Sequence, residues 1–337
     1  MIPRLDISFP LRRQWQYWFG DCKMQINDCR MQGEYLLNHA RTGIVLALRA
    51  ALPKGGRVGV VTYNCHTVAN AVVNAGCVPV FVDVTERLTI DVESVPTDLD
   101  AIVVTNLFGI RNDIEAIRKR CPKAIIIVDN AHGYGLPAEG DFTVYSINQG
   151  KMPSIGDGGI LIVKSKKSKV KSQINEMYET LPGYGIVEQC KLFFSMLLKA
   201  FAYSRCVYRL TMRMKKSSTP KVHQEVVMRQ MAPGVRRLYK AWLPTAEQEI
   251  EQQKANAAKI AYLGYETIKS DNGFMAIIRT NNVSSLKADF AKRGIETETH
   301  FARCIDWARE FGYINGSCPN AEKLTTQLVM IPTYCKI

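Results

Sequence analysis

Two residues in the first half of the chain have the types and positions that chemistry at the edge of a sheet requires. Asp129 follows the apolar run AIIIV, and Lys151 lies in a glycine-rich loop between two further strand-like runs. Ligands of parallel sheets bind outside the carboxyl ends of the strands, so Asp129 is expected to face a ligand. A lysine in such a loop is suited to form a Schiff base. Asp129 taken alone is equally well explained as a structural or capping residue.

The elements that must position these residues can be identified from hydrophobic patterning. Apolar, β-branched runs alternate with helix-like stretches, and the runs lie at 58–61, 78–84, 101–109, 124–130, 142–147 and 159–163. Their hydrophobicity is continuous rather than alternating, which indicates strands that are buried on both faces. The segment 42–52 is rich in helix formers and ends at Pro53 and Gly55, so a helix is expected to pack on the sheet.

The second half has a different composition. A basic segment at 164–216 is followed by a polar stretch, and a helix-like segment begins at Thr245. The remainder, which contains the strand-like run FMAIIRT, reads as a small α+β unit. We therefore expect an α/β protein with a mostly parallel, helix-covered sheet in a large domain at 1–235 and a small C-terminal α+β domain at 236–337.

Composition and charge narrow the functional classes. The chain has 337 residues, 47% of them hydrophobic and 22% charged, which is typical of an ordinary globular protein. The net charge is +13, and residues 164–216 hold 12 basic side chains against three acidic ones, which predicts attraction to an anionic partner. This basic stretch has no recognition motif for nucleic acid, so a nucleic-acid-binding function is the weakest alternative.

Cysteine usage and the N-terminal residues bear on the cellular location. Ten cysteines include no Cys-x-x-Cys pair and no spacing typical of zinc ligands, which indicates reduced thiols and predicts no metal site. The first residues lack a signal-peptide pattern, and no run reaches the roughly 18 apolar residues of a membrane span. We therefore expect a cytoplasmic protein.

Two short motifs surround the candidate catalytic residues. Ser146 begins a Ser-x-x-x-x-Lys element that ends at Lys151 and precedes Gly-Asp-Gly-Gly at 156–159, and Asp129 begins Asp-Asn-Ala-His at 129–132. These motifs and their spacing resemble those of the DegT/StrS-type sugar aminotransferases, which are fold-type I pyridoxal-phosphate enzymes. The likeness is specific over residues 40–163, fair over 245–337 and poor over 164–244.

The resemblance implies roles for three residues. Lys151 would attach pyridoxal phosphate through a Schiff base and then move a proton between the amino donor and the cofactor. Asp129 would pair with the pyridine nitrogen and keep it protonated. His132 stands where the family uses Gln or His to contact the ring oxygen of the cofactor. The simpler interpretations are that Lys151 is one more surface lysine and that His132 is a hydrogen-bonded core histidine.

The resemblance also implies a phosphate site at the start of a helix. Thr42 and Gly43 occupy the phosphate position of the family, and Ser146 matches the serine whose hydroxyl contributes to it. The unpaired N–H groups and the dipole of a helix N-terminus favour an anion. Arg41 replaces the usual small residue and either adds positive charge near the phosphate or points to solvent. A threonine that opens a helix is also a good N-cap.

Two positions depart from the family pattern. Cys65 stands where the family places an aromatic ring over the cofactor, so Tyr63 or His66 is a candidate to stack instead. The family also supplies a phosphate-binding Asn from the second subunit, whereas the best match here is Arg236 or its neighbour Arg237. Because family sites lie at a dimer interface, a homodimer is implied.

The function implied is a pyridoxal-phosphate-dependent transaminase. Its substrate would be a keto sugar, nucleotide-linked, that is converted to an amino sugar for cell-surface polysaccharide such as lipopolysaccharide, with glutamate as amino donor. The alternatives are a related enzyme that acts on a non-sugar substrate, and a non-catalytic or membrane-associated relative. A related dehydratase would carry His at the position of Lys151, so the lysine argues against it.

Residues 190–216 combine apolar and basic side chains at helical spacing. Such a segment can lie on an anionic membrane surface, which here would be the inner face of the membrane. It can equally be buried in a dimer interface, with its basic side chains at the rim. Both interpretations remain open at the level of the sequence.

Overall fold

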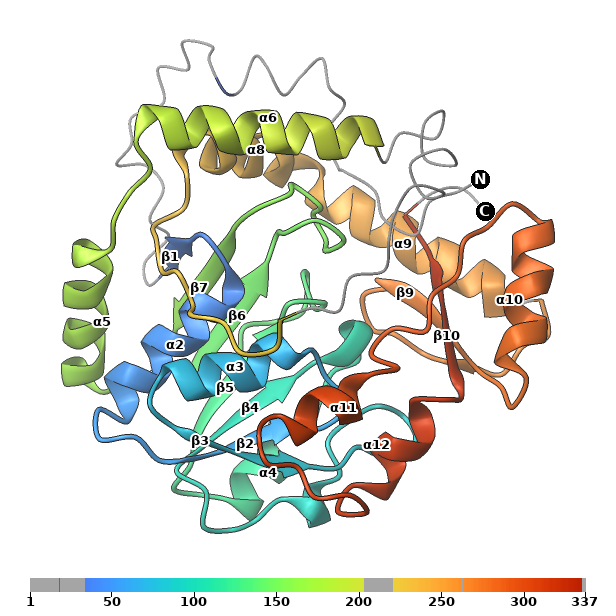
Figure 1. The fold of residues 1–337 in the computed structure, drawn as a ribbon, viewed down its shortest axis with the longest axis horizontal. Helices are drawn as coiled ribbons and strands as arrows, with labels where there is room; N and C mark the ends of the chain where they lie inside the picture. The colour runs from blue at the N-terminus through green and yellow to red at the C-terminus, as the bar shows by residue number, and fades with distance from the viewer. Residues whose placement is uncertain (1–17, 19–33, 203–220, 262, 335–337) are drawn as a thin grey trace.

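A seven-stranded sheet forms the centre of the molecule (Figure 1). The structure is a computed structural model, and it describes residue 18 and residues 34–202, 221–261 and 263–334. The strand order is β1-β7-β6-β5-β4-β2-β3, and β2 to β6 run parallel while β1 and β7 pair antiparallel. The strands are β1 (Glu34–Leu37), β2 (Arg57–Val61), β3 (Val78–Val82), β4 (Ala101–Thr105), β5 (Ile125–Asn130), β6 (Phe142–Ser146) and β7 (Gly159–Val163).

Each face of this sheet is covered, as its continuous hydrophobicity predicts. Alternate residues of β4 belong to different cores: Ile102 and Val104 to one, Ala101 and Val103 to the other. The second core is closed by α2 (Ala40–Ala51), α3 (His66–Asn74) and α5 (Ser168–Thr180), and the first by α4 (Ile114–Arg120) and elements from the C-terminal third. The expected α/β fold with a mostly parallel sheet is confirmed.

The strand β1 has no counterpart among the sequence predictions. It contains four residues and pairs with β7, which lies more than 120 positions later, as in the register Glu34 with Ile162. A run this short carries little local signal, and only the edge of β7 makes it a strand.

The C-terminal third forms its own three-stranded antiparallel sheet, in the order β10-β9-β8. Its core includes Ile260, Ile278, Phe290 and Val329, while Ile277 on the opposite face joins the core of the large sheet. The elements are α9 (Ala246–Ala261), β8 (Thr267–Ile268), β9 (Met275–Arg279), α10 (Val283–Lys292), α11 (Cys304–Arg309), α12 (Pro319–Leu324) and β10 (Leu328–Pro332).

Two helices lie beyond the edge of the large sheet that β1 forms (Figure 1). They are α6 (Ile186–Ala202) and α8 (Pro233–Trp242), and the short turn η4 (Leu243–Thr245) leads on into α9. Phe193 and Met196 of α6 are buried in a third core that α8 and Trp18 share. The division into domains at 235/236 stays a proposal, and α8 runs across that position.

The basic amphipathic segment predicted at 190–216 is described only in part, because residues 203–216 lie outside the described residues. Within residues 190–202, one side of α6 packs inside its own chain through Phe193, while Phe194 and Leu198 are exposed. None of the helices formed by the described residues is long and apolar enough to cross a membrane.

Candidate active site

The carboxyl ends of β4, β5 and β6 border a pocket of about 140 Å³. Six of the residues singled out from the sequence line it: Arg41, Cys65, Asp129, His132, Ser146 and Lys151. A larger groove of about 570 Å³ lies between α9 and the strands β8 and β9, but none of the predicted site residues lines it. The smaller pocket is therefore the candidate active site.

Lys151 enters the pocket from the loop that follows β6. The loop turns tightly, with Gly150 at φ 77° and the Lys151 N–H donating to the Asn148 carbonyl at 3.0 Å. The Lys151 Nζ lies 2.6 Å from His132 Nε2. Burial lowers the pKa of Lys151, although the nearby Cys65, Asp129 and Glu298 oppose that shift. The lysine side chain thus lies partly buried in the pocket, and its lowered pKa favours the neutral amine, which is the form of lysine that attacks carbonyl carbon.

Asp129 lies at the end of β5 and is almost fully buried. Its Oδ1 accepts the Ala131 N–H at 3.0 Å, and its Oδ2 accepts the Thr105 hydroxyl at 3.3 Å. The Asn64 amide donates to Thr105 Oγ1 at 2.8 Å, which orients that hydroxyl. Burial raises the pKa of Asp129, and Lys151 and these hydrogen bonds oppose the rise. A carboxylate held in this way is positioned to pair with a protonated ring nitrogen.

The ring of His132 lies between two phenylalanine rings. The ring centroids are 5.3 Å from Phe108 and 4.8 Å from Phe274, with interplanar angles of 22° and 18°. Its Nδ1 accepts the Phe108 N–H at 3.2 Å. Burial lowers the pKa of His132 well below the ordinary value, so the ring is neutral. His132 is consequently a rigid, uncharged partner of Lys151.

The rim of the pocket next to α2 is polar. His39 Nδ1 lies 3.3 Å from Asp157 Oδ1, but burial lowers the pKa of His39 to about 4 and raises that of Asp157 to about 6. At neutral pH the contact therefore joins a neutral imidazole to a carboxylate and is no ion pair.

Two buried atoms of the Lys151 loop, Asn148 Oδ1 and Gln149 Nε2, have no hydrogen-bond partner within the described part of the chain. Buried unpaired polar atoms are costly, so they indicate that a polar group binds here.

Thr42 and Gly43, predicted to bind phosphate, lie in the first turns of α2 but do not line the pocket. The Thr42 hydroxyl donates to Asn38 Oδ1 at 2.8 Å. Gly43 faces the sheet, where an added Cβ would lie 2.9 Å from Val144 Cγ1. The pocket instead meets this helix start through His39 and Arg41. The assignment of Thr42 and Gly43 to phosphate binding stays a prediction.

Cys65 lines the pocket, but neither Tyr63 nor His66, the two candidates to stack on a cofactor ring in its place, does so. The Tyr63 ring is buried, and its hydroxyl donates to the His300 carbonyl at 2.7 Å. His66 instead makes an edge contact with Trp307 at 5.0 Å between ring centroids. The cysteine is therefore the side chain that occupies this wall of the pocket.

Arg236 does not line the pocket of its own protomer. It lies on α8, and its Nε is buried without a hydrogen-bond partner among the described residues. The expected contact of Arg236 with a second subunit stays a prediction.

Further site residues went unrecognised in the sequence. Phe301 from the C-terminal unit lines the pocket at φ 60°, and His300 beside it lies 3.2 Å from Glu298 through Nδ1 and Oε2. The other residues missed are Asn64, Thr105, Phe108 and Phe274. Asn64 and Thr105 lie at strand ends like Asp129, which is a signal that could have identified them. Among the described residues, no group of three or more His, Cys, Asp and Glu side chains forms a metal site.

Comparison with known proteins shows which family the chain belongs to. The model of the DegT/DnrJ/EryC1/StrS aminotransferase family matches residues 36–337, nearly the whole chain. The chain belongs to this family. The resemblance seen in the motifs around Lys151 is thereby confirmed.

Individual relatives are distant. An uncharacterized protein of Methanocaldococcus jannaschii, MJ1066, is 25% identical over 89% of this chain and 81% of its own. The dTDP-4-amino-4,6-dideoxy-D-glucose transaminase of Shigella dysenteriae is 27% identical over 57% of this chain and 55% of its own. Among solved structures, the sugar aminotransferase CalS13 of Micromonospora echinospora has a TM-score of 0.70 at 15% identity and covers 100% of this chain and 96% of its own. DesV of S. venezuelae has a TM-score of 0.67 at 21% identity and covers 90% and 80%.

Proposed function

We propose that this member of an aminotransferase family is a pyridoxal-phosphate-dependent transaminase that aminates a keto sugar. The observation that carries the proposal is the Lys151 amine in the pocket, 2.6 Å from a neutral His132 at the strand ends where Asp129 also lies. A merely structural lysine would not need to lie in a pocket beside a buried carboxylate and the unpaired amide oxygen of Asn148.

The residues present fit the cofactor. Lys151 would attach it covalently, Asp129 would hold its ring nitrogen protonated, and Ser146 with Arg41 at the start of α2 would bind its phosphate. His132 would contact the ring oxygen. When bound, pyridoxal phosphate supplies the electron sink that stabilises a carbanion. The protein's own part is then proton transfer by Lys151 and exclusion of water by the aromatic rings around His132.

The substrate proposed is a nucleotide-linked keto sugar, with glutamate as amino donor and cell-surface polysaccharide, such as lipopolysaccharide, as the destination. Support comes from the partial match to a transaminase whose name specifies a dTDP-linked sugar. The net charge of +13 would also favour capture of a diphosphate. A cytoplasmic location belongs to the same proposal, and the six cysteines in the described part of the chain are free thiols.

A homodimer is also part of the proposal, because the resemblance implies a site shared between subunits. The α6 helix lies near the pocket, since the charge of its Lys199 acts on both His39 and Asp157. A second copy that covers the exposed face of α6 would therefore sit close to the pocket. Contact with an anionic membrane through 190–216 is the competing interpretation of this face.

The proposal is tested by fixing the cofactor to the protein with borohydride. Lys151→Ala should abolish both the reducible adduct and turnover of a keto sugar, since the loop after β6 offers no second lysine. Lys164→Ala is the matched control, because the Lys164 Nζ lies outside the pocket and donates to the Ala138 carbonyl at 2.7 Å. An adduct on the Lys151 variant, or a wild type that binds no cofactor, would refute the proposal and favour a non-catalytic relative.

A further inference from the structure

Phe108 has an unusual backbone for a large, buried side chain. It lies in the short turn η3 (Leu107–Gly109) after β4, with φ 53° and ψ 24°. Non-glycine residues in this left-handed region are uncommon and cost of the order of 1 kcal/mol or more. Such a conformation persists only where the surrounding contacts enforce it.

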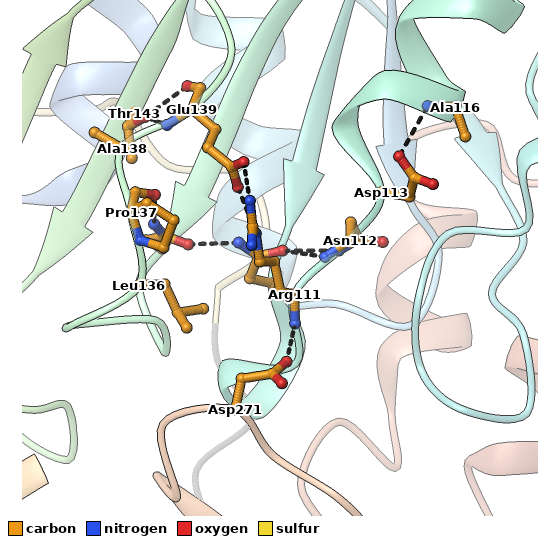
Figure 2. Close-up of polar contacts among 12 residues, drawn as sticks. Arg111, Asn112, Asp113, Ala116, Leu136, Pro137, Ala138, Glu139, Thr143 and Asp271 are labelled. Atoms are coloured by element: carbon orange, nitrogen blue, oxygen red, sulfur yellow. Dashed lines mark hydrogen bonds and ion pairs between the residues drawn. The ribbon is translucent and has the colours of Figure 1, made fainter. Parts of the chain in front are cut away.

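The enforcing contacts come from the segment that precedes β9. The Ser270 hydroxyl donates to the Phe108 carbonyl at 2.7 Å, and the Asp271 N–H donates to the Gly109 carbonyl at 2.9 Å. Asp271 in turn accepts the Arg111 N–H, and the Arg111 guanidinium makes a two-pronged ion pair with Glu139 (Figure 2). The turn is thus held from two sides, by the C-terminal unit and by the loop before β6.

The turn held in this way presents the Phe108 N–H to His132. That N–H donates to His132 Nδ1 at 3.2 Å. The rings of Phe108 and Phe274 stack nearly parallel to the His132 ring and restrict its orientation. A nitrogen that accepts a hydrogen bond carries no proton, and a neutral imidazole carries its single proton on the other nitrogen. His132 therefore has its proton on Nε2.

The tautomer of His132 determines which protonation state of the Lys151 side chain can accept its hydrogen bond. Nε2–H points at the Lys151 Nζ, 2.6 Å away. An ammonium has three donors and no lone pair, so it cannot accept this hydrogen bond, whereas a neutral amine can. We propose that the Phe108 N–H is a positioning group which, through the tautomer of His132, selects the neutral, nucleophilic amine of Lys151. Its use in attaching a carbonyl cofactor rests on the proposed function.

Several charged or titratable groups face Lys151 from the elements around it. Asp129 on β5, Cys65 before α3 and Glu298 before α11 favour the ammonium form. Burial and the Nε2–H of His132 favour the amine, and His300 lies beside His132, with 5.6 Å between ring centroids. Burial and the His132 contact both oppose the three groups that can carry negative charge, and the His132 contact is the part of this opposition that depends on the Phe108 N–H.

The tautomer can be measured directly in cofactor-free protein labelled with ¹⁵N-histidine. We expect the His132 signals, identified by their loss in His132→Gln, to show a protonated Nε2 and an unprotonated Nδ1 near neutral pH. A ring protonated on Nδ1, or on both nitrogens, would overturn the proposal. The protonation state itself is read from the wild type, and the variant serves only to identify the His132 signals.

The amine is tested by labelling the same cofactor-free protein with acetic anhydride across a pH series and quantifying the Lys151 peptide against the Lys164 peptide. Lys151 should react with a midpoint well below that of Lys164. His132→Gln presents an amide oxygen that accepts from an ammonium, so the midpoint should rise by about one pH unit, which is about a tenfold loss of reactive amine at neutral pH. Phe108→Gly keeps the N–H and removes only the ring, and should retain the low midpoint.

An unchanged midpoint in His132→Gln, or a midpoint in Phe108→Gly that rises as far as in His132→Gln, would overturn the proposal. Because no cofactor is present, these outcomes are independent of whether Lys151 proves to carry pyridoxal phosphate. A low midpoint with no reducible adduct would refute the proposed function and leave the role of Phe108 standing.

Discussion

Burial determines the protonation of most titratable side chains around the pocket. It lowers the pKa of Lys151 and His132 and raises that of Asp129, because each charged form loses its hydration. Cys65 is different. Burial raises the pKa of its thiol, but hydrogen bonding from His66 and Thr67 outweighs this, and the pKa falls to about 7.

We predict that Cys65 reacts with iodoacetamide at a rate that reaches half its maximum near pH 7 and levels off above it, because the thiolate is the nucleophile. Thr67→Val removes the hydroxyl that donates to Sγ at 3.1 Å, so the midpoint should move to higher pH. Short-time alkylation followed by peptide mass spectrometry measures both. Cys304 is the internal reference, since burial raises its pKa to about 12. A Cys65 rate that still climbs steeply at pH 9 would contradict the prediction.

At the scale of elements, close approach and capping explain how helices meet the sheets. The start of α2 lies directly on Gly159, where an added Cβ would come within 2.2 Å of the Ala40 nitrogen. The helix α12 lacks a side-chain cap of its own on Cys318. Asp83, just after β3, supplies one, because its carboxylate accepts the N–H groups of Asn320 at 3.0 Å and Ala321 at 2.8 Å.

Asp83→Ala should therefore lower the free energy of unfolding by about 1–3 kcal/mol, the cost of leaving buried N–H groups without a charged acceptor. Chemical denaturation of the purified protein measures the change. Asp98→Ala is the matched control, since Asp98 is exposed and makes one long ion pair with Arg57 at 3.5 Å, so its effect should be near zero. Equal effects of the two substitutions would show that Asp83 does not cap α12.

At the scale of the whole molecule, α6 presents an apolar surface of the kind expected of an interface. Val187, Phe194 and Leu198 recur at helical spacing on one side and are 66%, 63% and 69% exposed. Phe193 is fully buried in the third core, and its ring contacts that of Phe194, with 5.5 Å between ring centroids. Substitutions at Val187 and Leu198 therefore test association with the least disturbance of the fold, and a measurement of folding accompanies any change of Phe194.

If α6 forms the interface of the proposed homodimer, replacing Val187, Phe194 and Leu198 by Ser should give a folded monomer and weaken cofactor retention, because a second copy on this face would sit near the pocket. Sedimentation velocity measures the first effect and cofactor absorbance after dialysis the second. Ile314→Ser, at a residue 76% exposed far along the chain, serves as a control for loss of surface apolarity. A variant that remains dimeric but no longer sediments with anionic vesicles would contradict a dimer interface on α6 and support the membrane interpretation.

The sequence by itself determined the large sheet and pointed to residues that meet in one pocket. Six of its strands are continuous apolar runs, and such runs are local features that burial on both faces requires. Lys151, Asp129 and His132 belong to short motifs with fixed spacing at strand ends, so their meeting in one pocket follows from the order of the strands.

Only the tertiary structure decided what surrounds these residues. Phe108 and Phe274 enclose His132 from positions more than 160 residues apart in the chain, and β1 exists because the distant β7 offers it an edge. The left-handed turn of Phe108 depends on Ser270, a contact for which residues 107–109 carry no local signal. Contacts of this kind are made by folding rather than by neighbours in sequence, and they set the tautomer, the burial and the pKa values on which the chemistry of Lys151 depends.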